Sequence, residues 1–165
     1  MVIDLLASKL NVAFDRGVDC LMGLTKHKDD RVILVKPQTF MNDSGRVLKR
    51  LYENFNVSTD NLLVVHDDLD LSSGRVKIQY GGGDGGHRGV RSIINCLADN
   101  QFTRVRIGVG RQPDGMTSAD YVLEPILKEA QNDFTQVAEH AVDAVRCLVS
   151  DGRAQAMGHF NAYKE

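Results

Sequence analysis

The sequence predicts an α/β fold, in which helices flank a mixed, mostly parallel β-sheet within a single domain spanning residues 1–165. Three observations lead to this fold class. Segments with the two-residue alternation of strands and segments with helical periodicity follow one another along the chain. An apolar run at residues 62–65 ends in acidic residues, as a buried strand of an α/β sheet often does. No repeat, low-complexity tract or Pro/Ser-rich linker interrupts a chain of single-domain length.

The N-terminal third should contain a helix, two strands and a second helix. Apolar residues at helical spacing predict an amphipathic helix over residues 2–10. Strands are expected over residues 18–24 and 32–35, and Pro37 should end the second because proline has no amide proton for the ladder. Ser44 is a suitable cap for the next helix. The apolar side of that helix consists of Val47, Leu48, Leu51, Tyr52 and Phe55.

The rest of the chain continues the alternation of strands and helices. Alternating apolar and polar residues predict strands over residues 76–80 and 105–109. A long amphipathic helix over residues 126–149 should end at Gly152. The apolar side of a shorter helix between the two strands consists of Val90, Ile93, Ile94 and Leu97.

Composition indicates a protein of the cytoplasm without a membrane segment. No apolar run approaches the length of a membrane helix, and the N-terminus carries Asp4 and no basic leader, unlike a secretory signal. The three cysteines lie far apart without a CxxC pair, which favours reduced thiols.

Charge is unevenly distributed along the chain. The net charge is −2, but residues 75–111 contain seven basic and two acidic side chains, a local net charge of +5. Such a region is typical of a phosphate-binding face. A set of solvated charges on a strand and helix surface is the alternative.

The first chemically suggestive segment, KPQTFMNDSG, joins a predicted strand to a predicted helix. Its centre should lie at the C-terminal edge of the strand, where α/β proteins bind ligands. Phe40 and Met41 are large apolar residues in a turn that should be polar, and Asn42 offers both a donor and an acceptor. The alternative interpretation is a hydrophobic plug with a turn-forming asparagine.

The second segment, HDDLD at residues 66–70, directly follows a predicted buried strand. A carboxylate at this place can orient an imidazole, bind a metal or cap the next turn. Three acids in four positions, Asp67, Asp68 and Asp70, are also compatible with a metal-dependent phosphohydrolase. However, the sequence shows no second cluster of acids or histidines that is clearly placed to complete the metal's ligand shell.

The third and fourth segments combine glycine and arginine. Six glycines among residues 81–89 indicate positive φ angles or close backbone approach, and amides at a helix N-terminus suit an anion. No GK[ST] follows, so this is not a P-loop. His87 stands out because a histidine within a glycine loop is rarely a core residue. Further on, Arg104 and Arg106 should share one face of a strand whose other face is apolar.

Taken together, these segments resemble the bacterial-type peptidyl-tRNA hydrolases over nearly the whole chain. The resemblance rests on the order and separation of KPQTFMNDSG, VVHDDLDL, GGGDGGHRGVRSII and RVRIGVGR. It implies a single α/β domain that hydrolyses the ester between a peptide and the terminal ribose of tRNA. It also implies a monomer that acts on peptidyl-tRNA without a metal or cofactor.

The same resemblance assigns roles to individual residues. Asp67 corresponds to the carboxylate that orients the catalytic histidine. The residues corresponding to the site for the substrate's 3′ end and groove are Phe40, Met41, Asn42, His87 and Arg88, and those corresponding to the tRNA phosphate surface are Lys77, Arg104 and Arg106. At Gln79 many members of the family have a lysine, so a tRNA contact there should be weaker.

The family pattern also contains a segment ahead of this sequence. Family members begin with a strand, a GNPG loop and an HN pair whose histidine is the general base. We therefore expect the chain to be N-terminally truncated relative to the family and to miss the first strand.

Two further functions stay open at this stage. One is a non-catalytic RNA-binding relative of the hydrolases, and the other is a metal-dependent phosphohydrolase that uses Asp67, Asp68 and Asp70. If the chain hydrolyses peptidyl-tRNA without the family's N-terminal histidine, His66 or His87 would have to act as the base with Asp67 as its partner.

Overall fold

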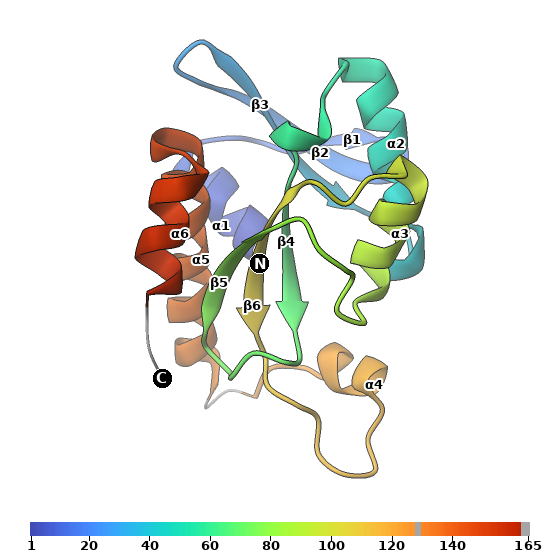
Figure 1. The fold of residues 1–165 in the computed structure, drawn as a ribbon, viewed down its shortest axis with the longest axis vertical. Helices are drawn as coiled ribbons and strands as arrows, with labels where there is room; N and C mark the ends of the chain where they lie inside the picture. The colour runs from blue at the N-terminus through green and yellow to red at the C-terminus, as the bar shows by residue number, and fades with distance from the viewer. Residues whose placement is uncertain (128–129, 163–165) are drawn as a thin grey trace. The chain divides into compact units, whose positions relative to one another are not determined.

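The protein forms two compact units in the computed structural model, which describes residues 1–127 and 130–162. The first unit contains Met1–Leu62 and Gly81–Phe102. The second contains Leu63–Tyr80 and the described residues from Thr103 onward. Figure 1 shows the elements of both units coloured along the chain. The prediction of a single domain over residues 1–165 stays a prediction.

The first unit combines an antiparallel sheet with three helices. Its strands are β1 (Asp15–Gly17), β2 (Cys20–His27) and β3 (Asp30–Pro37), in the order β1-β2-β3. Its helices are α1 (Val2–Lys9), α2 (Ser44–Phe55) and α3 (Arg88–Leu97), with the 3-10 turns η1 (Met41–Asp43) and η2 (Thr59–Asn61). The helix predicted at residues 2–10 and the end of the strand at Pro37 are confirmed.

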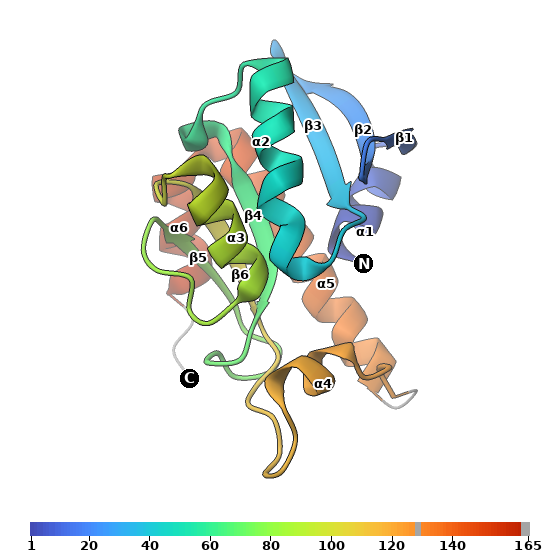
Figure 2. The ribbon, with the colours of Figure 1, turned by 90° about the vertical axis from the view of Figure 1, so that its right-hand side faces the viewer.

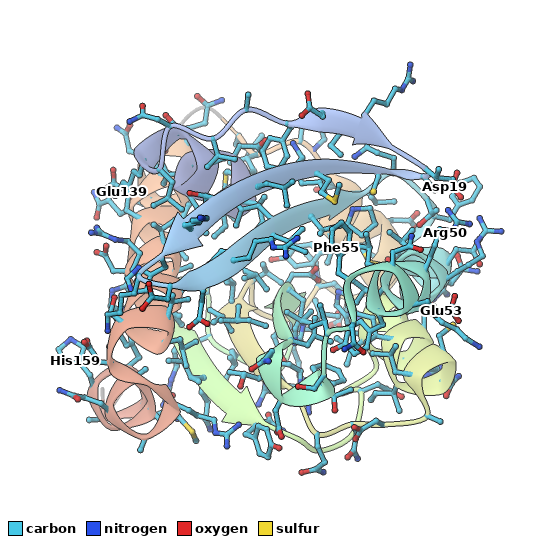
Figure 3. The ribbon with its side chains drawn as sticks, turned by 90° about the horizontal axis from the view of Figure 1, so that it is seen from above. Asp19, Arg50, Glu53, Phe55, Glu139 and His159 are labelled. Atoms are coloured by element: carbon cyan, nitrogen blue, oxygen red, sulfur yellow. The ribbon has the colours of Figure 1, made fainter. Side chains whose placement is uncertain are left out.

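The start of β2 differs from the predicted strand at residues 18–24. Val18 and Asp19 form the turn between β1 and β2, and Asp19 has a φ angle of 60°, which a strand residue does not adopt. Strand β1 was not predicted, because its three residues, Asp15–Gly17, show no alternation of apolar and polar side chains. Figure 3 labels Asp19 beside Arg50 of α2, whose guanidinium lies 3.5 Å from the Asp19 carboxylate. This exposed ion pair contributes little to stability.

A close crossing of α2 and α3, which lie side by side in Figure 2, organises the helical part of the first unit. The amide of Gly45 donates a hydrogen bond of 3.0 Å to the Ser92 hydroxyl, and both residues are buried. A Cβ atom at Gly45 would collide with the backbone of Ser92, so only glycine permits this approach. The predicted cap of α2 is wrong: Ser44 is the first helical residue, and its hydroxyl donates to the Met41 carbonyl.

The second unit is built on a three-stranded mixed sheet. Its strands are β4 (Leu63–Asp68), β5 (Val76–Tyr80) and β6 (Thr103–Gly108), with β6 in the centre, parallel to β4 and antiparallel to β5. Its helices are α4 (Ser118–Leu123), α5 (Gln131–Asp151) and α6 (Arg153–Asn161). Both α5 and α6 pack against the sheet (Figure 1). The core of the unit includes Val76, Ile78, Val105, Ala138, Ala141, Val142, Ala156 and Phe160.

The α/β class is confirmed, but the predicted single, mostly parallel sheet is wrong. Among the described residues there are two sheets, and β4–β6 is the only parallel pair. Short turns join β1 to β2 and β2 to β3, and strands joined in this way must run antiparallel. The predicted helix at residues 126–149 begins only at Gln131, and two of its residues, 128–129, lie outside the described residues. It ends, as predicted, before Gly152, which has a φ angle of 85°.

The outer edge of β5 is closed by a side chain. Asn161, at the end of α6, accepts a hydrogen bond from the Ile78 amide and donates one to the Ile78 carbonyl, both 2.8 Å long. A side-chain amide therefore replaces a neighbouring strand at the middle of β5. Unsatisfied edge groups invite pairing with other chains, so this contact protects the sheet as well as holding α6.

None of the described helices, including the 21-residue α5, combines the length and the apolarity that crossing a bilayer requires.

We predict that Asn161→Ala destabilises the protein by about 1–3 kcal/mol, because it leaves a buried backbone donor and acceptor without partners. Urea denaturation followed by circular dichroism would measure the change. The control is Asn132→Ala on the exposed side of α5, for which less than about 0.5 kcal/mol is expected. Equal midpoints for wild type and Asn161→Ala would contradict the assigned role.

Candidate functional site

The predicted site residues fall into two groups, one in each unit. The first unit brings together the β3–α2 connection, with Phe40, Met41 and Asn42, and the start of α3, with His87 and Arg88. Phe40 is 83% exposed and Met41 54% exposed, although both are large and apolar. The interpretation of this segment as a buried hydrophobic plug is therefore wrong for these two side chains, which are available to an apolar ligand group.

Gly89 sets the distance between the two parts of this group. A Cβ atom at Gly89 would lie 2.5 Å from the Met41 sulfur and 2.9 Å from Cε1 of His87. The absence of a side chain thus allows Met41 and the His87 ring to converge on the first turn of α3. Met41 and His87 lie about 46 positions apart in the sequence but are neighbours in the structure.

His87 caps α3 with its ring. Its Nδ1 accepts hydrogen bonds from the amides of Gly89 and Val90, each 3.1 Å long, in the manner of an N-cap side chain. An accepting Nδ1 carries no proton, so the neutral ring has its proton on Nε2. The cap gives this histidine a fixed orientation.

Asp84 orders the glycine-rich loop ahead of His87. Its carboxylate accepts a hydrogen bond of 2.7 Å from the Gly86 amide and two from the Arg91 guanidinium, of 2.9 and 3.2 Å. Gly85 and Gly86 have φ angles of 58° and 80°, which side-chain-bearing residues rarely adopt. The glycines at these two positions therefore serve the turn itself, and the loop is tied to α3 by Asp84.

In the second unit, Asp67 lies near the carboxyl end of β4. Nδ1 of the preceding His66 donates a hydrogen bond of 2.7 Å to the Asp67 carbonyl, because a carbonyl can only accept. The His66 ring is buried, with 8% of its residue surface exposed. Its Nε2, the nitrogen that could take a proton, is buried, which does not favour His66 as a catalytic base. In His87 the proton-accepting nitrogen is Nδ1, which the cap described above already uses.

The buried Asp68, next to Asp67, forms an ion pair with the partly buried Arg106. Nε of Arg106 lies 2.6 Å from Oδ2 of Asp68, and Nη1 of the same guanidinium donates to Oε1 of Gln79 at 2.8 Å. Oδ1 of Asp68 accepts the Asp70 amide at 2.9 Å. Burial by itself raises the pKa of Asp68, but the hydrogen bonds from Arg106 and the Asp70 amide outweigh it, so the pKa lies below its ordinary value of 3.8.

The predicted phosphate-binding residues lie on one face of the mixed sheet. Lys77 pairs with Arg106 across β5 and β6, and Gln79 pairs with Arg104, so all four point to the same side. Their accessibility differs, however. Arg104 is 2% exposed because it lies on the central strand, which corrects the expectation that it contacts tRNA phosphate directly. Lys77 is partly exposed.

The acidic run HDDLD does not assemble a metal site in the described part of the chain. Asp68 is bound by Arg106, and Asp70 by the exposed Arg111 at 2.7 Å. Within residues 1–127 and 130–162, no group of three His, Cys, Asp or Glu side chains is placed to hold an ion. Two of the three carboxylates, those of Asp68 and Asp70, instead pair with arginines, so the geometry gives no support to the metal-dependent phosphohydrolase.

Sequence reasoning did not find the Asp68–Arg106–Gln79 network. A partial signal was present, because Asp68 and Arg106 carry opposite charges and follow apolar residues in β4 and β6. The pairing itself depends on β6 lying between β4 and β5, which no local pattern reveals.

Comparison with known proteins places this arrangement in a family. The family model of peptidyl-tRNA hydrolase matches residues 1–165 of the chain. The chain belongs to the peptidyl-tRNA hydrolase family.

Relatives within the family are similar over most of their length. The peptidyl-tRNA hydrolase of Pseudothermotoga lettingae is 44% identical over 133 residues, which are 81% of this chain and 71% of the relative. That of Moorella thermoacetica is 41% identical over 163 residues, 98% of this chain and 86% of the relative. The crystal structure of the Acinetobacter baumannii peptidyl-tRNA hydrolase matches 99% of this chain and 84% of its own, with a TM-score of 0.89 and 29% identity.

We predict that His87→Ala destabilises the protein by about 1 kcal/mol, whereas His87→Asn leaves stability nearly unchanged because asparagine is a good N-cap residue. Thermal or urea denaturation of the two variants provides the measurement. Equal losses in both variants would show that the cap does not account for the stabilising role of His87.

We also predict that the Asp68–Arg106 pair stabilises the protein at neutral pH and that this contribution is lost in acid. The folded-state pKa of Asp68 is lower than the unfolded one, so the contribution is complete above the unfolded value near 3.8 and disappears as the pH falls through the folded value. Asp68→Asn should therefore lose less stability than wild type between pH 5 and pH 2. Parallel urea midpoints of wild type and variant across this range would contradict the prediction.

Proposed function

We propose that this protein hydrolyses the ester bond of peptidyl-tRNA and thereby releases the peptide and free tRNA. The observation that carries the proposal is the match of the family model to all 165 residues. The relatives from P. lettingae and M. thermoacetica carry the same name. Ester hydrolysis of this kind requires a water, a base that deprotonates it and donors for the oxyanion, and it needs no metal or cofactor.

In this proposal, the site residues of the first unit bind the reacting end of the substrate. Phe40 and Met41 offer an exposed apolar surface to the peptide and the terminal base, and Asn42 offers an amide for hydrogen bonding. His87 lies beside them with its ring fixed by the cap of α3. Arg88, exposed at the first position of α3, adds a positive charge for a phosphate.

In this proposal, Asp67 orients the general-base imidazole, which the family resemblance assigns to the HN pair of the family's N-terminal segment. A carboxylate that accepts the proton of one imidazole nitrogen leaves the other nitrogen free to take a proton from water, and it stabilises the imidazolium that forms. The place of Asp67 suits this role, because the adjacent backbone is held by His66 and Asp68.

Lys77 supplies the charge for the tRNA backbone on the polar face of the mixed sheet. Phosphate contacts of this type position a nucleic acid without reading its sequence. We further propose that the protein acts as a monomer in the cytoplasm, where translation takes place. Sedimentation at micromolar concentration would test the oligomeric state.

The decisive experiment is the release of an N-blocked amino acid from its tRNA by the purified protein. We expect cleavage by wild type and a loss of about a hundredfold or more in kcat/KM for Asp67→Asn, since misorienting a base removes general-base catalysis. Asp114→Asn, in an exposed loop, is the matched control and should retain wild-type activity. Wild-type activity in Asp67→Asn would overturn the role of Asp67. Binding of tRNA without any cleavage by wild type would replace the hydrolase with an RNA-binding module.

A further inference from the structure

We propose that Ser92 is a positioning residue of the substrate site. Its hydroxyl caps α2 from the neighbouring helix α3 and thereby fixes the two site segments of the first unit relative to each other. The first segment, residues 40–42, lies ahead of α2, and the second, residues 87–88, lies at the start of α3. The inference rests on the proposed function, which assigns both segments to the reacting end of the substrate.

Helix α2 begins without a cap from its own stretch of chain. Asp43 stands at the N-cap position, but its side chain makes no capping hydrogen bond, and the Ser44 hydroxyl donates backwards to the Met41 carbonyl at 2.9 Å. An N-cap side chain ordinarily accepts the amide of the second or third helical residue. Gly45 is the second residue of α2, and its amide donates to the Ser92 hydroxyl at 3.0 Å. Ser92 therefore supplies the cap acceptor, although it lies 47 positions further along the chain.

The junction between Gly45 and Ser92 is buried and tightly packed. Ser92 is 8% exposed, and Gly45 is also buried. A Cβ atom at Gly45 would collide with the carbonyl group of Ser92 and would come within 2.8 Å of the Ile93 amide nitrogen. The backbones of the two helices are therefore in direct contact. The hydrogen bond then fixes where α3 sits along α2, because a buried amide that loses its acceptor is costly.

Gly89 lies on the same side of α3, one turn before Ser92. Residues three apart share a helix face, and Gly89 is buried like Ser92. A Cβ atom at Gly89 would lie 2.5 Å from the Met41 sulfur and 2.9 Å from Cε1 of His87. Met41 and the His87 ring thus meet beside the face of α3 that Ser92 holds against α2. A slide of α3 along α2 would carry His87 away from Met41.

A separate contact holds the chain where the two helices end. The Thr59 hydroxyl, which follows α2, donates to the Asp99 carboxylate, which follows α3, at 2.5 Å. This contact lies beyond the C-terminal ends of both helices and contains no site residue. The first unit therefore offers a matched pair of hydroxyls. That of Thr59 stabilises the two helices only, whereas that of Ser92 also sets the geometry of the site.

Binding of an uncleavable probe separates positioning from stability. The probe is an N-acetylated 3′-aminoacylamino-3′-deoxyadenosine, in which an amide replaces the ester. Ser92→Ala should bind it about fivefold or more weakly than wild type, since small misplacements of binding groups have large effects. Ser92→Thr keeps the hydroxyl acceptor and should bind within about twofold of wild type. Thr59→Val should also keep wild-type affinity, although its urea midpoint should fall as that of Ser92→Ala does.

Hydrogen exchange of the Gly45 amide reports on the junction directly. The amide is buried and bonded, so it should exchange slowly in wild type. Ser92→Ala should accelerate its exchange by about tenfold or more, because the amide loses its acceptor. Thr59→Val should leave it nearly unchanged. Because the probe contacts both segments, saturating probe should slow the exchange in wild type.

Steady-state kinetics on N-blocked aminoacyl-tRNA provide the functional readout. Ser92→Ala should raise KM by about fivefold or more, and Ser92→Thr should restore the wild-type KM. Three results would overturn the inference: wild-type affinity for the probe in folded Ser92→Ala, equal weakening in Thr59→Val, or a folded Ser92→Thr that binds as weakly as Ser92→Ala.

The failure of the inference and that of the proposed function are distinguishable. If wild type binds the probe but does not cleave N-blocked aminoacyl-tRNA, the hydrolase function fails, and the affinities of the variants still decide the role of Ser92. If wild type does not bind the probe, the two segments do not hold the reacting end of the substrate, and the inference fails with that assignment.

Discussion

The central strand of the mixed sheet, β6, must satisfy a different environment on each of its faces. Its apolar side carries Val105, which joins the core with residues of α5, while its polar side carries Arg104 and Arg106. Both arginines are largely buried on this side, with 2% of Arg104 and 19% of the Arg106 side chain exposed. The polar side chains must therefore find partners within the sheet. The bridge from Arg106 to Asp68 and Gln79 meets this requirement and at the same time secures the end of β4.

A second constraint acts at the start of α3. Helix N-termini leave amides without intrahelical partners, and here the ring of His87 accepts two of them. The glycines on either side have separate tasks. Gly85 and Gly86 provide the turn that Asp84 stabilises, and Gly89 leaves room for Met41. A short stretch of chain thus caps a helix with a histidine ring and leaves room for an apolar side chain beside it.

Family membership and physical geometry answer different questions about this protein. The family match and relatives at 41–44% identity support the type of reaction. They do not show how each cation is used in this chain. Arg104 is buried and Arg106 is paired with Asp68, whereas Lys77 is partly exposed, although all three are basic residues of one sheet face. Basic residues that share a sheet face can therefore differ in their access to solvent.

The sequence alone determined the α/β class, most helices and strands, and the set of residues from which the site is built, because periodicity and turn chemistry are local properties. Helix α1, the end of β3 at Pro37 and the end of α5 before Gly152 were all predictable for this reason. Only the tertiary structure decided the pairing of strands into two sheets and the contact between Met41 and Gly89. It also decided the burial of Arg104 and the bridge from Arg106 to Asp68. These features join residues that are distant in the chain, and their energies depend on which neighbours exclude water from them.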